Sequence, residues 1–157
     1  VDATTGLYRP LAPESRTDIV EAVKTGLPKV FETAEGDLVG LATRIALDYQ
    51  VSAPEELLTR QILDNDAGHE SRISSLQGLH RQNPAALDPL WPQLLGSSDA
   101  RIRGAAVRLL QQTDPARGLR EAIAMAESDD LRLRQEGYRI VGQAEAPEAG
   151  TFLLAHL

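Results

Sequence analysis

The pattern of apolar and polar positions along the chain repeats with a fixed 31-residue period. The segments 52–82, 83–113 and 114–144 align without gaps. Each contains one apolar run at the spacing of a helix face, a short polar break, and a second such run. A period of this length is typical of stacked helical units, which cannot bury their apolar faces alone. The pattern therefore predicts a first helix, a turn and a second helix in every unit.

Each unit opens with a residue that commonly caps a helix, namely Ser52, Asn83 and Asp114. Their side chains can accept hydrogen bonds from the unpaired N–H groups of a first turn. A proline follows within two residues in all three units, and proline is tolerated there because its missing N–H costs nothing. Ser52 with Glu55 also matches a capping box. We therefore expect a first helix to begin at each of these residues.

The predicted second helices keep the same period at several classes of position. One class is basic, two are mainly apolar, and one is small: Arg72, Arg103 and Arg134; Leu76, Val107 and Tyr138; Leu79, Leu110 and Val141; Ser75, Ala106 and Gly137. The apolar classes, with Trp91 from a first helix, are expected to form the core. The small class predicts a close approach of neighbouring helices.

The pattern weakens toward both ends. Residues 37–49 read as the second helix of an earlier unit, and residues 17–35 as one or two short helices broken near Gly26–Pro28. Residues 147–157 read as a further first helix. We expect residues 1–14 to form an extended lead-in and residues 15–157 to form a single all-α domain.

The second half of each unit resembles a HEAT repeat. The segment 97–106 carries Ser or Asp in the turn, arginine a few residues later and then small residues, and 128–135 repeats this turn-to-arginine spacing. The resemblance covers about residues 37–157 and implies a right-handed α-α superhelix of about four helix pairs, with the second helices on the concave side. Because the unit is shorter than the family's and serine often replaces the turn aspartate, HEAT-like is the appropriate description.

A narrower resemblance concerns the segment 134–142 together with residues 147–149 and 153–154. It is similar to helical modules in large exported bacterial proteins, where they lie between a sugar-dehydrogenase-like propeller and a c-type haem domain. The resemblance implies a spacer fragment of a larger protein and a periplasmic or exported location. Without it, the cytoplasm is the expected compartment.

Composition and charge narrow the classes of function. The chain has 157 residues, a net charge of -7 and no cysteine. Disulfides, thiol catalysis and cysteine-ligated metals are therefore excluded within this sequence. The acidity opposes general nucleic-acid binding, and no apolar run is long enough to predict insertion in a membrane.

Candidate catalytic groups do not form a recognisable motif. The sequence has no glycine-rich phosphate loop, and its histidines lack the spacing of a helical metal site: His69, His80 and His156. The acidic pairs Glu55–Glu56 and Asp64/Asp66 are interpreted as helix-start and turn residues. We therefore assign no catalytic, cofactor-binding or metal-binding residue and do not expect an enzyme.

Arginines of the predicted second helices are the best polar candidates for binding a partner: Arg101, Arg103, Arg132 and Arg134. One interpretation is a positive groove for nucleic acid. The other is that turn acids such as Asp99, Asp129 and Asp130 pair with arginines of neighbouring units. Residues 99–157 hold 8 bases and 9 acids, which favours the second. We expect a non-catalytic scaffold or protein-interaction module contacting a protein or flanking domains, with an arginine-lined, nucleic-acid-binding groove as the alternative.

Overall fold

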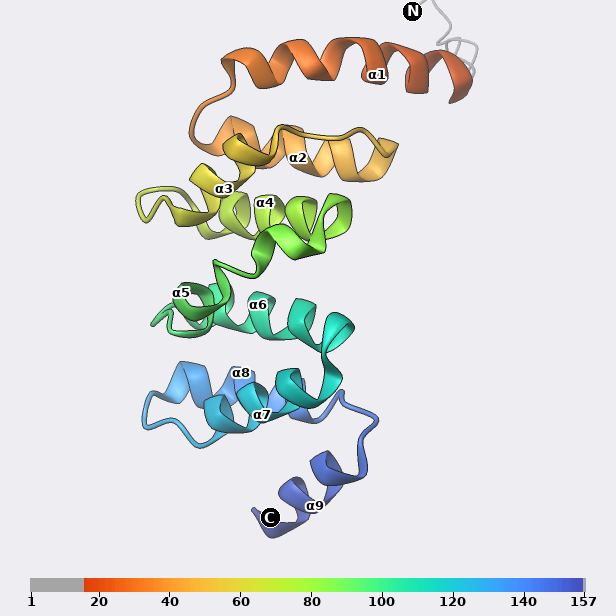
Figure 1. The fold of residues 1–157 in the computed structure, drawn as a ribbon. Coiled ribbons are helices and arrows are strands. Elements are labelled where there is room, and N and C mark those ends of the chain that lie inside the picture. Colours follow the sequence, from red (N-terminus) through yellow and green to blue (C-terminus); the bar gives the residue numbers. More distant parts are fainter. Residues whose placement is uncertain (1–15, 157) are drawn as a thin grey trace, which may run out of the picture.

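The computed structural model describes residues 16–156, and all regular elements among them are helical, as the sequence predicts. The lead-in predicted for residues 1–14 lies outside the described residues. The helices lie in successive layers from α1 at one end to α9 at the other (Figure 1). Their bounds are α1 Arg16–Thr33, α2 Asp37–Tyr49, α3 Glu55–Leu63, α4 His69–Gln82, α5 Trp91–Leu95, α6 Ala100–Thr113, α7 Pro115–Ala126, α8 Leu131–Val141 and α9 Pro147–Ala155, with a 3-10 turn η1 at Pro84–Leu87.

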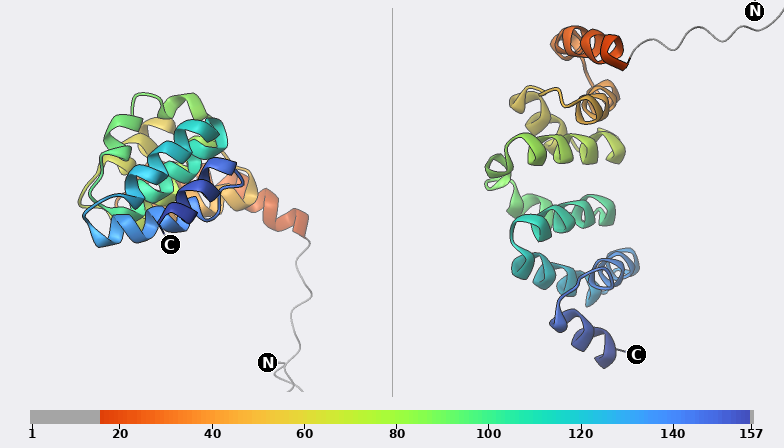
Figure 2. Two further views of the ribbon diagram at one scale, coloured as in Figure 1. Left: turned by 90° about the horizontal axis from the view of Figure 1, so that it is seen from below. Right: turned by 90° about the vertical axis from the view of Figure 1, so that its right-hand side faces the viewer.

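The sequence period is visible in where alternate helices begin. Helices α4, α6 and α8 start at His69, Ala100 and Leu131, each one full period after the last. With α2 they form one row, in which each member packs against the next. The remaining helices α3, α5 and α7 each pair with the member of the row that follows them. The right-hand view of Figure 2 shows the same succession of layers from the side.

Side chains at the predicted apolar positions fill the space between these helices. Leu79, Leu110 and Val141 are all buried, as are Leu76, Val107 and Trp91. Tyr138 differs from the prediction because it is only half-buried. It lies where α8 meets the last helix, and its ring packs against Phe152 at a centroid distance of 5.9 Å.

The small positions permit close helix packing. Ser75 and Ala106 are fully buried. At Gly137, an added Cβ atom would lie within 3 Å of the backbone of Met125 and Ala126. Glycine at this position therefore allows the backbones of α7 and α8 to approach more closely than any side chain would permit, as the pattern predicts.

Two of the three expected helix caps are wrong. Asp114 does cap α7, because its carboxylate accepts a hydrogen bond from the backbone N–H of Arg117 at 3.0 Å. By contrast, α3 begins only after Pro54, so Ser52 is not its cap. Asn83 precedes η1 and makes no side-chain cap bond. The predicted capping box also fails, because the Glu55 carboxylate accepts hydrogen bonds from the Asn83 side chain instead.

Proline explains one further difference from the expected helices, and tertiary packing explains another. The first helix expected in the unit 83–113 is divided into η1 and the short α5, because Pro89 and Pro92 remove two backbone donors. Conversely, the break expected near Gly26–Pro28 is absent, since α1 continues through Pro28. The buried side chains of Leu27 and Phe31 on either side of this proline hold the helix in place.

Candidate functional site

The polar turns that precede α6 and α8 fold in the same way. In each, a serine hydroxyl accepts a hydrogen bond from the backbone N–H of the aspartate two residues later, at 3.2 Å in both turns. The aspartates, Asp99 and Asp130, then accept two backbone N–H groups of the helix that follows, at distances between 2.8 and 3.3 Å. The two helices therefore begin with matched caps one period apart.

These helix starts border a recess of about 620 Å³, which we call the N-terminal edge. Its lining comes from the beginnings of α4, α6 and α8: His69, Ser98, Asp99, Ala100, Arg101, Asp130 and Arg132. Within it, the Nδ1 atom of His69 lies 3.2 Å from Oδ2 of Asp99. The edge thus brings side chains from three successive units onto one surface.

Both capping aspartates are held in their ionised form. Burial acts to raise the pKa of Asp99, but the N–H groups of Arg101 and Ile102, together with His69, outweigh it and lower the pKa. The pKa of Asp130 is lowered chiefly by hydrogen bonds from the backbone N–H groups that it caps. Because the chain's own carboxylates occupy these helix N-termini, an external anion would have to be recognised by side chains instead.

The four arginines predicted to bind a partner divide into two pairs. Arg101 and Arg132 are exposed and line the N-terminal edge. Arg103 and Arg134 are half-buried, because residues two apart on a helix point to different sides. Arg134 donates from Nη1 to the backbone oxygen of Ser128 at 3.1 Å.

Arg72, which lies one period before Arg103, is also half-buried and turned toward the protein. Arg72 donates from Nε to the backbone oxygen of Ile62 at 3.0 Å. In Arg103, the buried Nε atom has no hydrogen-bond partner within the described part of the chain. Only Arg101 and Arg132 are therefore placed at the surface of this recess.

A bridge between two units was not predicted. Glu136 accepts hydrogen bonds from Arg139 at 2.7 and 3.0 Å, and it also forms an ion pair with Arg108 of the preceding unit. Burial acts to raise the pKa of Glu136, but the two arginines outweigh it and lower the pKa. The expectation that turn acids pair with arginines of neighbouring units is wrong for Arg108 and Arg139. Both pair with a helical glutamate, which lies in the next unit for Arg108 and in the same helix for Arg139, while Asp99 and Asp130 cap helices.

Other features bear on what the described residues can do. No group of three or more His, Asp or Glu side chains within residues 16–156 is placed to hold a metal ion. None of the described helices is both long and apolar enough to cross a membrane.

No protein-family model matches the chain, and comparisons with curated proteins and with solved structures likewise find no match.

Proposed function

We propose that the chain is a non-catalytic interaction module, built as a right-handed superhelix of about four HEAT-like helix pairs, that binds a protein partner along the N-terminal edge. The observation that carries the proposal is the alignment of three helix starts, each one period apart, in one row of packed helices. A row of this kind presents the same surface from each successive unit, and extended surfaces of this type are how helical-repeat proteins bind.

The edge offers two exposed guanidinium groups, those of Arg101 and Arg132. Each carries five N–H donors in a planar fork that suits carboxylates. The carboxylates of Asp99 and Asp130 are already engaged by backbone N–H groups. We therefore assign recognition to the arginines and expect the partner to present acidic side chains at this edge.

The same charges favour a protein partner over nucleic acid. The chain carries a net charge of -7, and Asp99 and Asp130 line the same recess as the two arginines. A continuous phosphate backbone would meet both carboxylates and needs a surplus of positive charge. A protein partner can instead place single acidic side chains at Arg101 and Arg132 and other groups beside the two aspartates. The weaker sequence resemblance adds that the module serves as a spacer within a larger protein.

Site-specific photocrosslinking in the source cell tests this proposal. A photoreactive residue replaces Ser98, an exposed residue that lines the edge, and a matched variant carries it at Gln143, which is exposed beyond the opposite end of α8. We expect the edge variant to capture a discrete protein that the Gln143 variant does not, and we expect Arg101→Gln to reduce that capture. Equal capture from both positions, or crosslinks to nucleic acid, would contradict the proposal.

A further inference from the structure

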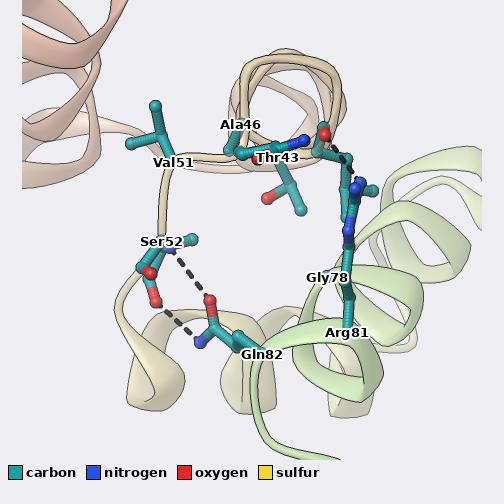
Figure 3. A pocket seen from close by; sticks show the side chains of 10 residues that line it. Thr43, Ala46, Val51, Ser52, Gly78, Arg81 and Gln82 are labelled. Atoms are coloured by element: carbon teal, nitrogen blue, oxygen red, sulfur yellow. Dashed lines mark hydrogen bonds between the residues drawn. The ribbon is translucent and has the colours of Figure 1, made fainter.

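A separate pocket of about 350 Å³ lies between α2, the segment after it and the C-terminal half of α4 (Figure 3). Its lining mixes aliphatic and polar side chains: Thr43, Ala46, Leu47, Gln50, Val51, Ser52, Ala53, Gly78, Arg81 and Gln82. The volume lies in the range of sites for small ligands. The pocket lies toward the C-terminal end of α4, whereas the N-terminal edge lies at its start.

The unit that carries the pocket differs from the repeat at one of the lining positions. Gly78 occupies the position that Leu47, Leu109 and Ile140 hold in the other units. Leu109 and Ile140 are buried, so an aliphatic side chain normally fills this position. At Gly78 this place is taken by the Thr43 methyl group, which lies 2.6 Å from where a Cβ atom would be, so glycine lets α2 and α4 pack closely beside the pocket.

The walls of the pocket are fixed by hydrogen bonds. The Gln82 side chain accepts from the backbone N–H of Ala53 at 3.1 Å and donates to its carbonyl oxygen at 2.8 Å. Figure 3 shows this side chain bridging from α4 to the segment that carries Ser52. A pre-formed wall reduces the ordering cost that a ligand would otherwise meet on binding.

A second departure from the repeat occurs at the rim. Arg81 stands where the other units have Gln50, Gln112 and Gln143. Its Nη1 atom donates to the carbonyl oxygen of Leu47 at 2.6 Å, which satisfies the end of α2 and fixes the side chain along one wall. This bond uses one of five guanidinium donors.

The positive charge of Arg81 at this rim is not neutralised by any residue that lines the pocket. None of the ten lining residues is acidic. Among the described residues, the ion pairs found do not involve Arg81. Hence the unit that carries the pocket also places a guanidinium at its rim.

We propose that this pocket binds a carboxylate carried on a short aliphatic group, either as a small free acid or as a glutamate side chain of a peptide. The aliphatic group occupies the pocket, against Ala46 and Val51. The carboxylate accepts hydrogen bonds from Arg81. The site is independent of the interaction proposed for the N-terminal edge, since it uses different residues at the other end of α4.

Titration of the ¹⁵N-labelled chain, followed through its backbone and glutamine side-chain amide signals, tests the site. The free-acid probe is 4-methylpentanoate, with 4-methylpentanamide as its neutral match. The peptide probe is acetyl-Leu-Glu-Leu-amide, with acetyl-Leu-Gln-Leu-amide as its match. We expect an acid probe to shift the signals of Gly78, Ser52 and the Gln82 side chain, and the neutral match to leave them unchanged.

The variant Arg81→Gln installs the residue found in the other units and removes the charge, and we expect it to weaken binding about tenfold or more. Arg120→Gln makes the same change at an exposed position of α7 and leaves binding unchanged. Binding by only one of the two acids identifies the source of the carboxylate. No shift at these residues with either acid, equal shifts from the neutral probes, or unweakened binding by Arg81→Gln would overturn the proposal.

Discussion

Gly137 offers the most direct test of how closely α7 and α8 pack. Its missing side chain faces the backbone of the preceding helix, and an added Cβ atom would lie within 3 Å of the Met125 carbonyl carbon and of the N and Cα atoms of Ala126. These backbone atoms belong to the last turn of α7 and cannot rotate away as a side chain can. The variant Gly137→Ala therefore forces the two helices apart.

Two opposing effects set the expected magnitude. Overpacking of this kind costs about 1–3 kcal/mol. Replacing glycine by alanine within a helix returns about 0.5–1 kcal/mol, because alanine loses less backbone entropy on folding. Because the clash is with backbone atoms, the overpacking cost lies in the upper part of this range, at about 2–3 kcal/mol, and the net loss in the free energy of unfolding is about 1–2.5 kcal/mol. With a urea dependence of roughly 2 kcal/mol per molar, the midpoint falls by about 0.5–1.2 M.

Urea unfolding followed by circular dichroism at the helix band measures the change. Gly26→Ala is the matched control, because Gly26 lies inside α1 and an added Cβ atom there would meet nothing within 4 Å. We expect the control to leave stability unchanged or slightly raised. If Gly137→Ala were as stable as this control, the close contact between α7 and α8 would be refuted.

Three further predictions concern charge. Glu136→Gln should lower the free energy of unfolding by about 1–2 kcal/mol, since Glu136 holds both Arg108 and Arg139; an unchanged urea midpoint would show that the bridge does not stabilise the fold. The pKa values of Glu136 and Asp130 are lowered in the folded chain, so the stability that their charged forms contribute is present at neutral pH and lost as pH falls below about 4. The urea midpoint should therefore be lower at pH 3 than at pH 6, and equal midpoints would contradict this. Burial lowers the pKa of His80, so the unfolded chain takes up its proton first and stability falls as pH drops below about 6.5. His80→Gln, which installs the residue found one unit later, should reduce that part of the pH dependence. If the variant and the unchanged chain showed the same dependence of melting temperature on pH between pH 7 and pH 5, this role of His80 would be wrong.

The fold could be predicted where the sequence repeats, because equivalent positions of successive units can be compared with each other. The starts of α4, α6 and α8, and the buried line formed by Leu79, Leu110 and Val141, follow from a single period. Each unit meets nearly the same environment, so the same residue classes recur at the same positions. Helix caps were less predictable because contacts between residues distant in the sequence can override them: the Gln82 side chain holds the backbone of Ala53, and α3 starts after this residue.

The candidate sites were predicted only in part. Arg101 and Arg132 share an exposed recess as the repeat indicates, whereas Arg103 turns inward. The Glu136 bridge spans units with a separation of 28 residues from Arg108. That spacing is slightly less than one period, so the repeat alone does not predict the contact. It depends on how α6 and α8 are rotated relative to each other.

The central claim is that the repeated units are stacked in one row, and distances between spin labels test it most directly. The chain has no cysteine, so labels attach only at introduced sites. Gln50, Gln112 and Gln143 are exposed equivalents separated by two periods and one period. Pulsed electron paramagnetic resonance should give the shortest distance for 112–143 and an intermediate one for 50–112. The distance for 50–143 should be close to the sum of the two. A 50–143 distance no longer than that of 50–112 would contradict the stacked row.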